Sequence, residues 1–344
     1  GLGPGLPQGT ISLIAPTEEI SGRGTQRVVD GVTIEFIDAA GTEAPAEFMF
    51  YLPERRALCT AEVVTATFHN LLTPRGAKVR DALGWTRAID YVLETYGDKS
   101  DYVFASHHWP TWGQENVESL LTQQRDIYRY VHDQTLRNAN GGATMFEAAE
   151  AVEEPAFESD ASAFNTRGYY GTLNHNSKAV YQYYFGWWGG VPADYNALPH
   201  VVTASRYVEA MGGADATLAL GAKAFDAGDF RWAAEVFNHV VFADPENEAG
   251  RKWLAATYEQ LGFQAESGAW RSYYLVGANE LRNGIPNIGN PQLGNPEFLR
   301  AVDSMDLMDS LAARFNPAKM TGDPFNVNLV FPDRDETVTL QICI

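Results

Sequence analysis

The first third of the chain alternates short β-prone runs with one helical stretch. The β-prone runs are residues 11–16, 27–38, 46–53 and 57–64. Asp30-Gly31 interrupts the second run with a two-residue hairpin signal. From 80 to 96 the apolar positions recur at helical spacing, and a short apolar strand opens the segment 101–112. Strands that alternate with a helix predict a layered α/β arrangement up to about residue 113.

The middle of the chain has the periodicity of helices. Residues 114–140 form one long helix candidate, and an acidic stretch at 149–162, broken by Pro155, predicts a solvated turn. Between 219 and 270, small and aromatic residues fall near the spacing of tetratricopeptide (TPR) repeats, which are helical hairpins of about 34 residues. An ordinary helical bundle is the alternative. Either way, we expect helical hairpins in which small residues permit close helix crossing.

The last part of the chain changes composition twice. Residues 284–298 are rich in Gly, Pro and Asn, which is typical of a linker. An amphipathic helix at 301–315 and a hairpin at 325–344 follow, with Pro332-Asp333 in the hairpin turn. The chain begins without Met and stops inside an alternating β pattern. We therefore expect a processed product or a fragment that contains only the opening of a further α/β domain.

Composition and charge exclude several classes of protein. The 344 residues include 25 Lys and Arg against 44 Asp and Glu, which gives a net charge of −19 and argues against a nucleic-acid-binding surface. No uncharged apolar run approaches the roughly 18–20 residues that a membrane helix needs. Two cysteines exclude a disulfide framework and a thiolate zinc cluster. We expect a soluble, acidic, well-packed protein.

Three residues suggest a metal site. The sequence has no HExxH, Walker or GxSxG motif. Glu62, however, interrupts an apolar run, where a carboxylate is costly to bury unless it binds a cation or a partner. With Glu43 and His107 it would offer oxygen and nitrogen ligands suited to Zn²⁺ or a similar divalent ion. On spacing alone, three unrelated residues in loops and strand ends are the alternative.

Two further segments are candidates for binding an anion or an oxygen-rich group. Arg75 stands beside a glycine, where its guanidinium could bind an oxyanion in bidentate fashion; a surface arginine paired with an acid is the alternative. Tyr170 and His175 lie in a run dense in hydrogen-bonding side chains. That run either contacts an oxygen-rich group or begins a helix capped by Asn174 or Asn176.

The chain resembles the class III alkylsulfatases, which are zinc hydrolases with a metallo-β-lactamase-like fold. The likeness runs over about 9–340 and is carried by segments that include GTEAPAEF (41–48), FASHHWPTWG (104–113), RGYYGTLNHNSKAVYQ (167–182) and VFADPENEAGR (241–251). FASHHWPTWG and VFADPENEAGR together are too long to match by coincidence. The resemblance implies an α/β plus all-α chain. Its parts would be the C-terminal half of a metallo-β-lactamase-like αββα domain (1–113), a helical, TPR-like dimerisation domain (114–283), a linker (284–298) and a truncated sterol-carrier-like α/β domain (299–344).

The same resemblance implies a chemistry. Glu43, Glu62 and His107 become ligands of a binuclear Zn²⁺ centre, with Glu62 as the bridging carboxylate, and Arg75, Tyr170 and His175 become substrate-binding residues. A metal-bound hydroxide would hydrolyse an alkyl sulfate ester to an alcohol and inorganic sulfate. The family also implies a homodimer formed through the helical domain and favours a periplasmic or secreted location. The alternatives are a non-catalytic dimerisation protein and another metallo-β-lactamase-like hydrolase that acts on a thioester or phosphoester.

One motif of the family is absent from these residues. The principal metal motif, H-x-H-x-D-H, belongs on the N-terminal side of every segment quoted above, and the sequence does not contain it. Three ligands hold two zinc ions poorly. We therefore expect these 344 residues in isolation to bind zinc weakly or not at all.

Overall fold

The computed structural model describes residues 14, 16–155, 163–286, 296–320 and 322–342. It divides into two compact units, one formed by Ile20–Pro286 and the other including Asn287–Ile344. The strand predicted at 11–16 and the linker predicted at 284–298 fall mostly outside the described residues.

Six strands among the described residues form one sheet in the first unit. They are β1 (Arg23–Val29), β2 (Val32–Asp38), β3 (Phe48–Leu52), β4 (Ala57–Cys59), β5 (Tyr102–Phe104) and β6 (Thr111–Trp112). They follow one another in chain order across the sheet, and only the pair β4–β5 is parallel. Asp30 and Gly31 join β1 to β2 with φ angles of 49° and 79°, the left-handed conformations that a tight hairpin turn requires. The predicted hairpin is confirmed.

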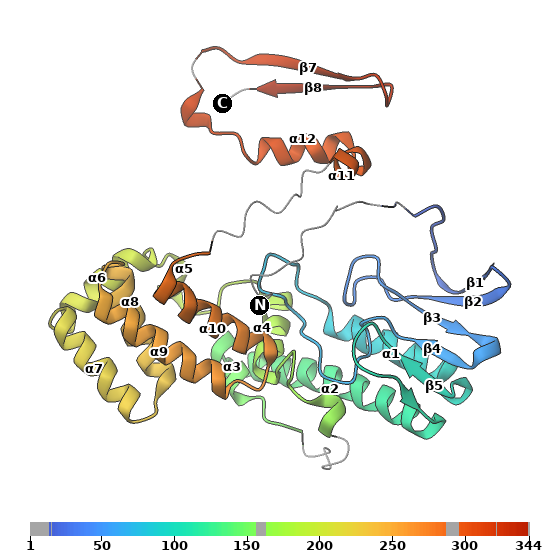
Figure 1. Cartoon of the computed structure of the whole chain (residues 1–344), viewed down its shortest axis with the longest axis horizontal. Coiled ribbons are helices and arrows are strands. Elements are labelled where there is room, and N and C mark those ends of the chain that lie inside the picture. The colour runs from blue at the N-terminus through green and yellow to red at the C-terminus, as the bar shows by residue number, and fades with distance from the viewer. Residues whose placement is uncertain (1–13, 15, 156–162, 287–295, 321, 343–344) are drawn as a thin grey trace. The chain divides into compact units, whose positions relative to one another are not determined.

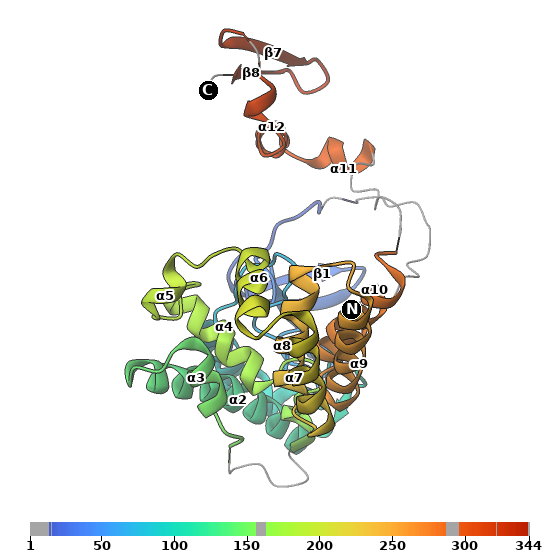
Figure 2. The ribbon, with the colours of Figure 1, turned by 90° about the vertical axis from the view of Figure 1, so that its left-hand side faces the viewer.

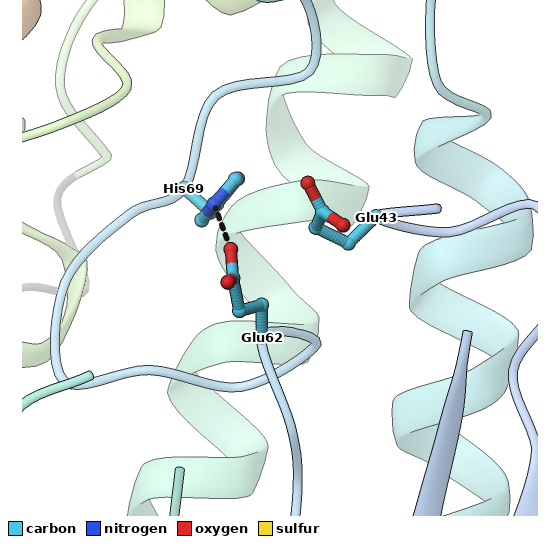
Figure 3. A group of neighbouring side chains, drawn as sticks. All are labelled: Glu43, Glu62 and His69. Atoms are coloured by element: carbon cyan, nitrogen blue, oxygen red, sulfur yellow. Dashed lines mark ion pairs between the residues drawn. The ribbon is translucent and has the colours of Figure 1, made fainter. Parts of the chain in front are cut away.

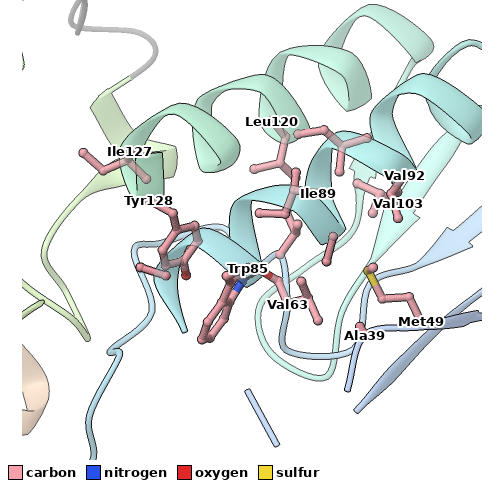
Figure 4. Packing of buried hydrophobic residues seen from close by; sticks show 14 of the residues in the cluster. Ala39, Met49, Val63, Trp85, Ile89, Val92, Val103, Leu120, Ile127 and Tyr128 are labelled. Carbon is pink, nitrogen blue, oxygen red and sulfur yellow. Dashed lines mark hydrogen bonds between the residues drawn. The ribbon is translucent and has the colours of Figure 1, made fainter. Parts of the chain in front are cut away.

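Helices α1 (Ala82–Tyr96) and α2 (Gln114–Asn140) pack together on the sheet and complete the α/β core. α1 is the crossover between the parallel strands β4 and β5, and the short 3₁₀ helices Pro53–Arg55 and Gly97–Lys99 flank β4 and α1. Trp85 on α1 is fully buried, stacks on Tyr128 of α2 with ring centroids 4.8 Å apart, and donates a hydrogen bond from Nε1 to the Val63 carbonyl (Figure 4). This core fixes the segment that follows β4.

The rest of the first unit is helical. Its helices are α3 (Met145–Ala151), α4 (Leu173–Phe185), α5 (Pro192–Tyr195), α6 (His200–Ala210), α7 (Ala214–Asp226), α8 (Phe230–Ala243), α9 (Glu248–Gln264) and α10 (Gly268–Asn283), with a 3₁₀ turn at Ala163–Thr166. α7 to α10 pack successively as antiparallel hairpins (Figures 1 and 2). A Cβ on Gly221 would lie 2.4 Å from the Phe237 ring, so α7 and α8 approach closely because that residue is glycine. An α/β part followed by helices is therefore confirmed.

The second unit contains two helices and a hairpin among its described residues. They are α11 (Pro296–Ala301), α12 (Ser304–Ala312), β7 (Phe325–Phe331) and β8 (Glu336–Ile342), with a 3₁₀ turn at Pro317–Lys319. The predicted 301–315 helix begins later, because the Asp303 side chain caps α12 by accepting a hydrogen bond from the Met305 amide. Arg334 in the hairpin turn donates to the Val302 carbonyl and joins the hairpin to the helices. Within the described residues, no helix combines the length and apolarity needed to cross a bilayer.

Candidate metal centre

Glu62 lies on a turn rather than in a strand. The run predicted as a strand at 57–64 leaves the sheet after Cys59, and a turn follows, closed by a hydrogen bond of 2.9 Å from the Val63 amide to the Thr60 carbonyl. Ala61 within this turn has a φ of 49°. Val63 and Val64 return to the core while the Glu62 side chain stays 31% exposed. The apolar run therefore carries an acidic residue without burying its charge.

Two imidazoles approach Glu62 from two segments. Nε2 of His69 lies 3.3 Å from Oε2, and Nε2 of His107, which follows β5, lies 3.2 Å from Oε1. Glu43, in the loop after β2, completes a group with Glu62 and His69 whose ligand atoms all lie within 4.8 Å of one another (Figure 3). Each oxygen of Glu62 therefore faces a different histidine.

Hydrogen bonds hold His69 in place on three sides. Its amide donates to the Tyr128 hydroxyl and its carbonyl accepts from the side chain of Asn176, which is fully buried on α4. Ring atom Nδ1 lies 3.0 Å from the Asn70 carbonyl, which can only accept, so the ring hydrogen belongs on Nδ1. Burial lowers the pKa of His69 and so favours the neutral ring. The Nε2 lone pair then faces the Glu62 carboxylate, an arrangement that a cation between the two would stabilise.

Negative charge gathers around Glu43. Arg80 forms an ion pair with the Glu43 carboxylate and also donates to the Glu43 carbonyl. Burial, together with the nearby charges of Glu43 and Glu62, raises the pKa of Glu47 to about 7. The carboxylates of Glu43 and Glu62, beside the imidazole nitrogen of His69, form a donor set that fits Zn²⁺ or another divalent cation.

A cavity of about 320 Å³ lies beside this group. It is lined by Asn70, Pro74, Tyr170, His175, Lys178, Ala269, Trp270, Tyr273 and Tyr274. The Tyr170 ring packs edge-on against His69, with centroids 4.7 Å apart, and so connects the cavity wall to the metal-ligand group. The cavity therefore opens next to the candidate metal centre.

Two of the three predicted substrate-binding residues line this cavity, and the third, Arg75, follows a lining residue in the sequence. Tyr170 and His175 belong to its lining, although both ring nitrogens of His175 have protein partners, the Leu72 carbonyl and the Trp270 indole. Arg75 is exposed next to the lining residue Pro74, and its guanidinium has no ion-pair partner within the part of the chain that the structure describes. It is therefore available to an anion.

His69 is the member of the group that sequence reasoning missed. It stands in the buried stretch 63–71, where a His-Asn pair interrupts apolar and Thr residues. A polar pair in such a stretch must have partners inside the protein, and that is the signal that could have identified it.

Known proteins with similar sequences share one activity. Residues 144–284 match the family model described as alkyl sulfatase dimerisation. A linear primary-alkylsulfatase from a Pseudomonas species is 47% identical over 342 residues, a match that covers 99% of this chain and 50% of that protein. An alkyl/aryl-sulfatase of Saccharomyces cerevisiae is 45% identical over 345 residues, covering 100% of this chain and 53% of the relative.

A solved structure agrees with these relatives. The chain superposes on a stereoselective inverting sec-alkylsulfatase from a Pseudomonas species with a TM-score of 0.90 and 41% identity, over 96% of this chain and 52% of that one. The chain spans about half the length of the curated relatives described above. Over nearly its whole length the chain is therefore similar in sequence and fold to about half of an alkylsulfatase, and residues 144–284 match the dimerisation model of that family.

Proposed function

We propose that the protein hydrolyses alkyl sulfate esters to an alcohol and inorganic sulfate with the help of divalent zinc. The observation that carries the proposal is the Glu62 carboxylate, which presents one oxygen to His69 and the other to His107. The names of the similar proteins support the substrate class.

Glu43, Glu62 and His107 are the proposed ligands of a binuclear Zn²⁺ centre, with His69 at the second oxygen of Glu62. A carboxylate with one oxygen toward each of two imidazoles has the orientation that sharing between two ions requires. When bound, zinc supplies a Lewis acid and a water whose pKa lies near neutrality, from which the attacking nucleophile is generated.

The cavity beside this group is the proposed substrate site. Arg75 contacts the sulfate, because a planar guanidinium matches an oxyanion and offsets the charge that the departing sulfate carries. Tyr170 and His175 contribute to the wall near the ester, and the aromatic rings of Trp270 and Tyr274 contact the alkyl chain and exclude water from it.

The proposed architecture follows the family. Residues 1–113 are the C-terminal half of a metallo-β-lactamase-like domain, 114–283 are TPR-like helices, and 299–344 begin a sterol-carrier-like domain. The predicted linker 284–298 overlaps α11, which begins at Pro296. The protein is proposed to be a homodimer. Its contact surface, here named the α5–α6 face, consists of the exposed side chains Trp187, Tyr195, Leu198, Val201, Val202 and Tyr207. Exposed apolar surface of this kind is typical of an interface, and the match to the dimerisation model supports a second copy as the partner.

Sulfate release tests the proposal. With the protein expressed from its complete open reading frame, we expect sulfate release from dodecyl sulfate to fall at least about a hundredfold in Arg75→Ala, which loses an anion contact worth several kcal/mol. Arg55→Ala, which removes an exposed arginine of the 3₁₀ turn after β3, is the control and should keep full activity. Full activity in Arg75→Ala would refute the anion site. Hydrolysis of a thioester or phosphoester without sulfate release would refute the substrate class.

A further inference from the structure

Arg80 is a buried arginine whose three guanidinium nitrogens all have partners. It is 8% exposed and stands just before α1. Its Nε donates to the Glu43 carbonyl at 2.7 Å, and its Nη2 bonds the Glu43 carboxylate. Its Nη1 donates to the carbonyl and the side-chain oxygen of Asn70, at 2.8 and 2.7 Å. Nη1 also lies 3.5 Å from Nδ1 of His69. The acceptors on all three nitrogens offset the cost of burying the guanidinium.

These bonds connect two segments that each carry a proposed metal ligand. Glu43 belongs to the loop after β2, and Asn70 directly follows His69. The backbone of Arg80 is itself anchored, because its amide donates to the Leu71 carbonyl at 2.9 Å. One rigid, planar side chain therefore sets the separation between the two segments.

Arg80 also acts on the orientation of the His69 ring. The Asn70 carbonyl that accepts from Arg80 also accepts the ring hydrogen of His69, at 3.0 Å. Fixing that carbonyl fixes the tautomer and the direction of the Nε2 lone pair toward Glu62. The bond to Glu43 occupies Oε1 and leaves the other oxygen of that carboxylate for a cation.

We propose that Arg80 is a positioning residue of the metal centre, which holds Glu43 and His69 in the geometry that an ion needs. The proposal rests on the proposed function, because it assumes that Glu43, Glu62 and His69 bind metal. Arginine is required rather than lysine, since an ammonium cannot reach Glu43 and Asn70 together in one plane.

Cobalt binding by the protein expressed from its complete open reading frame tests this role. Co²⁺ alone is titrated, and its visible absorption reports both affinity and ligand geometry. We expect Arg80→Met to weaken Co²⁺ binding about 10–100-fold and to change the spectrum, as removal of an outer-shell partner does. Arg80→Lys should recover only part of the affinity. Arg282→Met, which breaks a bidentate pair with Glu259 between α9 and α10, is the matched control and should change affinity less than about twofold.

A double-mutant cycle separates positioning from general stability. If Arg80 acts through Glu43, the losses of affinity in Arg80→Met and Glu43→Gln should not add in the double variant. A folded Arg80→Met with wild-type affinity and spectrum would overturn the inference, and so would additive losses. If both Arg80 variants fail to fold, as judged by circular dichroism, Arg80 serves folding alone and the positioning role is refuted. A wild-type protein that takes up no metal would instead refute the proposed function.

Discussion

Glu62 presents its two oxygens to His69 on one side and His107 on the other, at 3.3 and 3.2 Å. Because the side chain is 31% exposed on a turn, water can hydrate its charge, and no buried basic group is needed to offset it. The geometry instead suits a carboxylate that is shared between two ions.

If Glu62 is the bridging carboxylate proposed above, its substitution should affect both zinc ions, whereas substitution of a ligand of one ion should affect that ion alone. We expect Glu62→Gln to lose both zinc ions, whereas His107→Ala should lose about one, because only the bridging residue contacts both. Zinc content after dialysis of the protein, expressed from its complete open reading frame, provides the measurement. His239→Ala, a histidine of α8 that packs on Tyr207, is the control. Loss of a single ion in Glu62→Gln would contradict the bridging role.

Residue types alone could identify Glu62 as a candidate metal ligand, because a carboxylate in an apolar run is costly to bury unless it binds a cation or a partner. They could not place His69 against it. That contact depends on Tyr128, 59 residues later, and Asn176, 107 residues later, which bond the His69 backbone. A spacing argument over one segment does not reach partners so distant, and the family resemblance pointed to His107 instead.

At the scale of elements, the local sequence pattern predicted the bounds of the long helix better than the end of the strand before Glu62. The helix expected at 114–140 is α2 with the same bounds, since its apolar stripe is long and uninterrupted. The strand expected at 57–64 stops at Cys59, because Thr60 bonds the Val64 carbonyl through its hydroxyl and Ala61 adopts a left-handed conformation. No signal in the run 57–64 marks that turn, although it is what exposes Glu62.

A larger side chain at the close crossing of α7 and α8 should lower the free energy of unfolding. In Gly221→Val the new Cβ would overlap the Phe237 ring, which is fully buried and cannot easily move. We expect the free energy of unfolding to fall by about 1–3 kcal/mol. Ala219→Val on the exposed side of α7 is the matched control, and chemical denaturation measures both. Equal stability of the two variants would show that the helices separate without penalty.

At the scale of the whole molecule, an exposed apolar surface coexists with a net charge of −19. The α5–α6 face includes Trp187, Tyr195 and Val201, which are 67%, 66% and 56% exposed. Copies of so acidic a chain repel one another, so association requires an apolar contact of this kind.

Charge placed on this face should separate the copies. We expect the wild-type protein to sediment as a dimer and the double variant Leu198→Asp, Val201→Asp to sediment as a monomer in analytical ultracentrifugation. Val28→Asp alters another exposed valine, on β1, and should leave the dimer intact. A wild-type monomer, or a double variant that remains dimeric, would exclude this face as the interface.

A single assay can test whether the metal centre is needed for hydrolysis of a sulfate ester. Sulfate release from dodecyl sulfate is measured with the protein expressed from its complete open reading frame, first as purified, then after chelation, and then after zinc is restored. We expect chelation to abolish sulfate release and zinc to restore it, and we expect Glu62→Gln to release no sulfate even with zinc present. Release that continues unchanged after chelation, or in Glu62→Gln, would contradict it.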